Sequence, residues 1–120
     1  MTISGGPSRP TITLMDDGAI TSDEYHAVKC VVEGFRSAFV RVVCDQLHDI
    51  FIQGIAYEGG DAADLVINGT LHYAETSIAA DTGGGRGYIV PVETLYQVQI
   101  VCHNQSTDTQ ATATIEVTLA

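Results

Sequence analysis

The sequence predicts an all-β protein, a sandwich of seven to nine short antiparallel strands. Segments in which apolar and polar residues alternate with a period of two recur along the chain, and this is the period of a strand that buries one face. Turn-forming residues interrupt these segments about every ten residues, a spacing typical of sandwiches and barrels. The chain has 120 residues, of which 45% are hydrophobic, which is enough for one folded domain with its own core.

Residues 1–10 predict a flexible N-terminal arm, and residues 11–120 predict the sandwich domain. Two glycines and two prolines fall among the first ten residues, a content that sustains neither a helix nor a central strand. The first predicted strand, Thr11–Met15, follows the arm. Asp16-Asp17-Gly18 would end it in a turn, because aspartate side chains bond nearby amides and glycine accepts positive φ.

The sequence of residues 22–48 is compatible with either a helix or strands. Thr21 and Glu24 stand three residues apart as in a capping box, and apolar residues then recur at helical spacing, which would place a helix here and make the fold α+β. Six valines in sixteen consecutive residues favour strands instead, because valine is stiff at χ1. We favour two strands, at residues 25–33 and 38–44.

The middle of the chain predicts further strands and a long loop. Residues 50–57 and 65–73 are the strand segments. The second contains Asn68-Gly69, the strongest two-residue hairpin signal, so it is either one strand or two. Residues 74–87 predict the longest loop, because they end in a stretch with four glycines among six residues.

The clearest strands lie in the last third of the chain. A short strand at 88–90 leads into residues 94–104, where only Val101 breaks the alternation. Residues 111–119 alternate throughout and form the last predicted strand. The residues that share one face of the central strand are Tyr96, Val98, Ile100 and Cys102.

The pattern in residues 94–104 resembles strand F of fibronectin type III and other immunoglobulin-like domains. The residues that carry the resemblance are Thr94, Tyr96, Val98, Ile100 and Asn104. The resemblance implies that Tyr96 is the tyrosine-corner residue, whose hydroxyl bonds the backbone upstream near residues 90–93. It also implies that Asn104 closes the strand into the next turn. The chain departs from the immunoglobulin pattern because it has no Trp and has Val98 where the strand-F cysteine would stand, so the inter-sheet disulfide is not expected.

Charge and cysteine content exclude several classes of partner. Fifteen acidic residues against five basic ones give a net charge of −10. Such a surface repels phosphate backbones and anionic lipids, so we expect neither nucleic acid nor a membrane as partner. Three cysteines do not make a paired framework. No signal peptide is visible, so we expect synthesis in the cytoplasm with free thiols.

No motif indicates a catalytic activity. The sequence has no nucleophile elbow, and its glycine-rich stretch lacks the Lys-Ser/Thr of a phosphate-binding loop. The cysteines and histidines lack the short spacings of zinc sites. We therefore expect no catalytic residue, no metal site and no cofactor, and we expect that the protein is not an enzyme.

The sequence favours a non-catalytic interaction protein, an immunoglobulin-like module that docks on a larger assembly such as a phage capsid or tail. The protein would then reside in the virion, with a capsid, a tail or a homo-oligomer as its partner. This step rests on analogy between folds. The alternative is a carbohydrate- or receptor-binding module that uses loops at one end of the sandwich, with Tyr57, Tyr73 or Tyr88 as stacking platforms. The residues expected to contact a partner protein are Ile3, Pro7, Arg9, Pro10, Arg86 and Tyr88.

Overall fold

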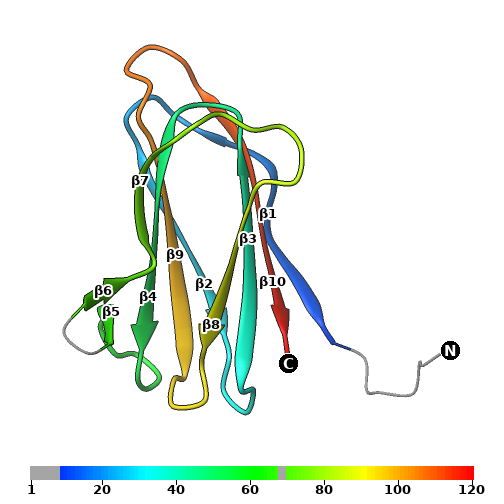
Figure 1. The fold of residues 1–120 in the computed structure, drawn as a ribbon, viewed down its shortest axis with the longest axis vertical. Coiled ribbons are helices and arrows are strands. Elements are labelled where there is room, and N and C mark those ends of the chain that lie inside the picture. Colours follow the sequence, from blue (N-terminus) through cyan, green and yellow to red (C-terminus); the bar gives the residue numbers. More distant parts are fainter. Residues whose placement is uncertain (1–8, 68–69) are drawn as a thin grey trace, which may run out of the picture.

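The computed structural model describes residues 9–67 and 70–120, and within them the chain forms ten strands and no helix (Figure 1). Ile3 and Pro7, two of the expected partner contacts, lie outside the described residues. The strands are β1 (Thr11–Ile20), β2 (Tyr25–Val31), β3 (Ser37–Cys44), β4 (His48–Ile55), β5 (Ala63–Ile67), β6 (Thr70–His72), β7 (Ala74–Ile78), β8 (Arg86–Pro91), β9 (Gln97–Asn104) and β10 (Ala111–Leu119). The described part of the chain therefore has no helix that could span a membrane.

Two antiparallel sheets pack face to face (Figure 1). One has the strand order β1-β10-β3-β8, and the other has β2-β9-β4, with both β7 and the β5–β6 hairpin pairing with β4. Apart from that hairpin, the pairing is nested: β1 pairs with β10, β2 with β9, β3 with β8 and β4 with β7. Nested pairing of eight strands over two sheets is the topology of a jelly roll.

The predicted all-β sandwich is confirmed, but the immunoglobulin-like relationship is not. An immunoglobulin-like sandwich joins its first, second, fifth and fourth strands in one sheet, an order that this chain does not have. Among the described residues, the Tyr96 hydroxyl makes no hydrogen bond, whereas its main-chain carbonyl accepts from Val32 N and Glu33 N. The alternation in residues 94–104 determined which side chains face the core, but it carried no information about which strands lie beside them.

Residues 22–48 form strands β2 and β3 and the start of β4 rather than a helix. The predicted contact between Thr21 and Glu24 nevertheless exists, because Glu24 Oε1 accepts hydrogen bonds from Thr21 N and Thr21 Oγ1, each at 2.9 Å. It closes the turn before β2 instead of starting a helix. The valines that follow alternate between the core and the outer face, and that burial fixes the strand conformation.

The chain has more strands than the seven to nine expected, because two segments behave differently from the sequence prediction. The run at 65–73 splits into β5 and β6, on either side of Asn68-Gly69, which lie outside the described residues. Part of the predicted loop at 74–87 is strand β7, which pairs with His48, Ile50 and Phe51 of β4. The glycine-rich stretch is left as the connection from β7 to β8.

The core lies between the two sheets and is built mainly from valine and isoleucine. Tyr88 belongs to it, with 9% of its surface exposed and its hydroxyl donating to Glu75 at 2.6 Å. Burial and the neighbouring Glu75 carboxylate both raise the pKa of this hydroxyl. The side chain of Tyr88 is thus not on the surface, where a partner contact was expected.

Candidate interaction surface

The two ends of the sandwich differ in chemistry. We name the end that carries Pro10 and Ala120 the terminal end, and the opposite end the network end (Figure 1). The connections at the terminal end are residues 32–36, 56–62 and 92–96. The connections at the network end are residues 21–24, 45–47, 79–85 and 105–110.

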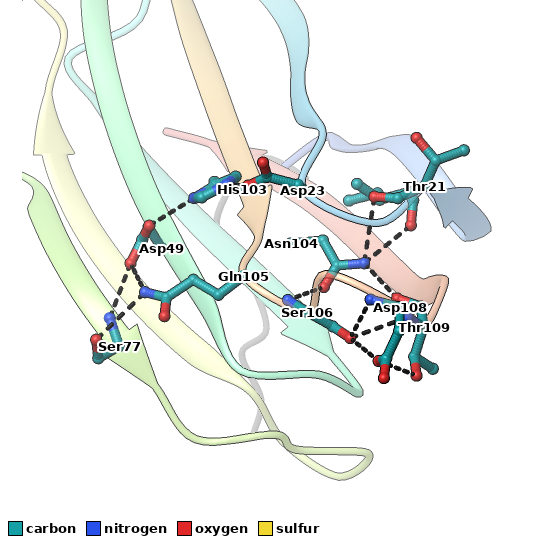
Figure 2. Close-up of polar contacts among 11 residues, drawn as sticks. Thr21, Asp23, Asp49, Ser77, His103, Asn104, Gln105, Ser106, Asp108 and Thr109 are labelled. Carbon is teal, nitrogen blue, oxygen red and sulfur yellow. Dashed lines mark hydrogen bonds and ion pairs between the residues drawn. The ribbon is translucent and has the colours of Figure 1, made fainter.

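The network end is organised around His103, which lies between two aspartates (Figure 2). Its Nδ1 is 2.7 Å from Asp49 Oδ2 and its Nε2 is 2.8 Å from Asp23 Oδ1. Carboxylate oxygens only accept hydrogen bonds, so a contact on each ring nitrogen favours the doubly protonated imidazolium form of His103. Neither nitrogen is left to take a proton from a substrate. The arrangement binds three segments together and is unsuited to general-base catalysis.

The pKa shifts follow from these contacts. Burial alone would lower the pKa of His103, but the hydrogen bonds to Asp49 and Asp23 outweigh it and hold that pKa above its ordinary value. Burial would raise the pKa of Asp49, but hydrogen bonds from His103, Ser77 N and Gln105 Nε2 hold it below the ordinary value. Asp23 and Ser77 both have positive φ, 60° and 54°, so the backbone is strained where it meets the network.

Asn104 completes the network end from a fully buried position (Figure 2). Its Nδ2 donates to the carbonyls of Ile20, Thr21 and Thr109, and its Oδ1 accepts from Ser106 N. One side chain therefore ties the end of β9 to the end of β1 and to the turn before β10. The resemblance implied that Asn104 closes its strand into the next turn. The contacts with Ser106 N and Thr109 O lie in that turn.

A second buried group consists of thiols beside an imidazole. Cys44 of β3 and Cys102 of β9 come from facing sheets and are both fully buried. Interaction with Cys102 and with the neighbouring His48 lowers the pKa of the Cys44 thiol, whereas interaction with Cys44 and burial raise the pKa of the Cys102 thiol. Within the described ranges, no three Cys, His, Asp or Glu residues are placed to hold a metal ion.

An apolar strip runs along the β8 edge of the four-stranded sheet onto the β5–β6 hairpin. We define it by four exposed side chains: Phe39, Val66, Leu71 and Ile89. Phe39 and Ile89 are partners across β3 and β8, and Val66 and Leu71 are partners across the hairpin. Tyr73 joins the two halves, because its hydroxyl donates to Ile89 O at 2.9 Å. Ile89 is 73% exposed, an unusual position for an isoleucine in a sheet.

Two clefts open beside this strip at the terminal end. The apolar cleft, of about 130 Å³, is lined by Leu65, Val66, Tyr73, Pro91, Thr94 and Leu95. The acidic cleft, of about 420 Å³, shares Thr94 and Leu95 with it. Three exposed glutamates line the acidic cleft, namely Glu33, Glu58 and Glu93, together with the exposed ring of Tyr57. The apolar strip and the apolar cleft share Val66, so they lie next to each other on the surface.

The structure separates the residues that the sequence proposed as partner contacts. Arg9 and Pro10 are exposed at the terminal end, whereas Arg86 lies at the start of β8, at the network end, and pairs with Glu75 at 3.7 Å. Sequence reasoning missed Phe39 and Ile89. A signal was present, because each stands between two core residues at a position where alternation calls for a polar side chain.

No family model matches the chain, and no curated protein matches it. Among solved structures, the chain is similar to YomS, a protein derived from the SPBc2 prophage, with a TM-score of 0.65. The match covers 100% of both chains at 16% sequence identity. At this identity the similarity shows a shared fold, and the fold is one that a phage-derived protein uses.

Proposed function

We propose that the chain is a non-catalytic structural protein that docks on a larger protein assembly, such as a phage capsid or tail, and resides in the virion. The observation that carries the proposal is the apolar strip. Exposed apolar side chains on a sheet edge are an aggregation hazard unless a partner covers them, so a monomer rarely keeps a contiguous set. Full burial of an exposed side chain of this size contributes about 1.5–3 kcal/mol, and the four side chains of the strip are 45–73% exposed, so each contributes roughly half to three-quarters of that value when a partner covers it.

Two further observations support a phage assembly. The fold is shared over the whole length with a prophage-derived protein. A net charge of −10 on 120 residues disfavours nucleic acid as the partner, because the surface repels phosphates. A protein surface that supplies apolar side chains is the partner that the strip fits best.

The test is incorporation into virus particles. Particles from a culture that produces the chain are banded on a density gradient and analysed by quantitative mass spectrometry. We expect a fixed number of copies per particle, reduced by Ile89→Lys in the strip. Val31→Lys on β2 is the matched control, since Val31 is also a half-exposed strand residue but lies in the other sheet. Recovery of the wild-type chain only outside the particles would contradict the proposal.

A carbohydrate- or receptor-binding module is the second candidate, and Tyr57 is the observation in its favour. Of the three tyrosines proposed as platforms, Tyr57 is 67% exposed beside the acidic cleft, Tyr73 is half-buried and hydrogen-bonded, and Tyr88 is in the core. A sugar that stacks on Tyr57 would raise the melting temperature, and the stabilisation would grow with the logarithm of one plus the ratio of its concentration to Kd. A screen of oligosaccharides by thermal shift, with Tyr57→Ala as control, tests this function separately.

A further inference from the structure

We infer that residues 1–10 of one copy of the chain dock in the two clefts at the terminal end of a second copy. The inference rests on the proposed function, because it names one partner of an interaction module. It assigns the clefts an occupant, and it predicts that free protein associates with itself before any larger assembly is present.

The clefts define the chemistry of their occupant. The two clefts are adjacent, because Thr94 and Leu95 line both, and one is apolar whereas the other is acidic. Every charged residue that lines either cleft is a glutamate. An occupant must therefore supply apolar side chains to one cleft and a cation to the other. A guanidinium suits the acidic cleft, because it pairs with carboxylates and also stacks on a tyrosine ring such as Tyr57.

Residues 1–10 match this chemistry. The segment contains Arg9 and no acidic residue, and the first acid in the chain is Asp16. Its apolar residues include Ile3, Pro7 and Pro10. A segment that carries an arginine and no acid is complementary in charge to a cleft lined by three glutamates.

The place where the segment leaves the molecule also fits. Pro10 O accepts a hydrogen bond from Leu119 N, which fixes the start of β1 at the terminal end, the end that carries the clefts. Eight residues precede Arg9 outside the described structure, and eight residues can span up to about 26 Å. That length is enough to cross from one copy to a cleft on its neighbour.

The sheet order favours a second copy over the same copy. The strand β1 is one edge of the four-stranded sheet, and the clefts lie beside β8, the opposite edge. The ends of β10 and β3 stand between them, joined where Arg36 N and Ser37 N donate to Ala120 O. A neighbour placed with its β8 edge against β1 offers its clefts without that obstruction. The contact is head-to-tail, so repetition produces a ring or an open chain.

Sedimentation velocity over a range of protein concentrations tests the self-association. We expect the full chain to form dimers or larger species, and a variant lacking residues 1–8 to be a monomer. Arg9→Glu alone should dissociate the assembly, and Arg9→Glu combined with Glu93→Arg should restore it. All three glutamates are exposed, so their substitution leaves the fold intact. Asp16→Asn, an exposed carboxylate on β1 away from the clefts, is the matched control.

A peptide of residues 1–10, labelled with fluorescein and titrated with the truncated chain, tests the site directly. Changing Glu33, Glu58 and Glu93 to Gln should weaken binding about tenfold, because the cleft then has no charge to attract the guanidinium of Arg9. Absence of peptide binding overturns the inference. The inference is also overturned if the full chain is a monomer and does not bind the peptide. In that case residues 1–10 occupy the clefts of their own copy and not those of a second copy. Neither result affects incorporation into particles, which tests the proposed function independently.

Discussion

Tyr25 lies flat on His103, with ring centroids 3.7 Å apart and ring planes 2° from parallel. Tyr25 is on the outer face of β2 and is 62% exposed, whereas His103 on the neighbouring β9 is 8% exposed. The tyrosine thus covers a ring that already has Asp49 and Asp23 on its two nitrogens. A cation is attracted to the face of an aromatic ring, which accounts for the parallel arrangement.

Removing the tyrosine ring should destabilise the fold through His103. We expect Tyr25→Ala to cost about 1 kcal/mol, the size of a partly exposed cation–π contact, while Tyr25→Phe should cost a small fraction of that. Urea unfolding at pH 6 measures both. The difference between the two variants should shrink at high pH, where the imidazole is neutral. An alanine variant as stable as wild type at pH 6 would show that the stack contributes nothing.

Stability should fall as pH rises through the folded-state pKa of His103. The contacts with Asp49 and Asp23 raise that pKa, so the folded state binds the proton more tightly than the unfolded chain does. The stabilisation is complete below the unfolded value of about 6.5 and is lost above the folded value. Urea midpoints measured at increasing pH from about 6 upward should therefore decline.

His103→Gln is the control for this pH dependence. Glutamine keeps a donor for one aspartate but does not titrate, so the decline should be shallower than in wild type. It should not vanish, because hydrogen bonds to Cys44 and to Gln46 O raise the pKa of His48 despite its burial. A variant with the slope of the wild-type protein would assign the pH dependence to other groups.

The sequence predicted where most strands lie, but it did not predict which strands pair with each other. Residues 111–119 form β10 with the expected core residues, and residues 97–104 form β9 with Val98, Ile100 and Cys102 in the core as the alternation predicts. Tyr96, which was expected on the same face, precedes the strand and is only half-buried. Which strands pair is set by contacts between segments far apart in sequence, such as β1 with β10. No local pattern encodes those contacts, so the resemblance in one strand carried no information about the order of the strands in the sheets.

The candidate surface was harder to predict than the core. Glu33, Glu58 and Glu93 are ordinary exposed acids in three separate turns, and only the jelly-roll topology brings those turns to one end. Phe39 and Ile89 are recognisable as apolar residues at outward positions, but only once the strand register is known. Asp23, Asp49 and His103 likewise meet from three segments whose spacing in sequence resembles no motif.

Asn104 should be the most sensitive polar residue of the network end. Asn104→Ala removes the donor to three carbonyls and the acceptor for the amide of Ser106. The carbonyl of Ile20 then lacks this partner in a buried place, whereas that of Thr21 still accepts from Glu24 N, so we expect a loss of about 2 kcal/mol. Asn104→Asp should not rescue it, because a carboxylate cannot donate to carbonyls. Thr107→Ala in the same turn is exposed and serves as control. Equal urea midpoints for Asn104→Ala and Thr107→Ala would contradict this assignment.

Three glycine-to-alanine substitutions separate backbone strain from steric clash, two in the glycine-rich connection and one in the turn between β2 and β3. Gly85 has φ of 74°, and an added Cβ would collide with the carbonyl of Val42 and lie 2.7 Å from Val43 Cγ2. Gly34 has φ of 90° but open space around it, and Gly84 has open space and no positive φ.

We expect almost no change in stability for Gly84→Ala, a loss of about 1 kcal/mol for Gly34→Ala from strain alone, and a loss of about 3 kcal/mol for Gly85→Ala from strain and clash together. Thermal unfolding of the three variants measures the order. The Val42 carbonyl belongs to a central strand and cannot move aside, whereas nothing opposes the new methyl group at Gly34. If Gly34→Ala were as damaging as Gly85→Ala, the close approach of the connection to β3 would not be the reason for glycine at position 85.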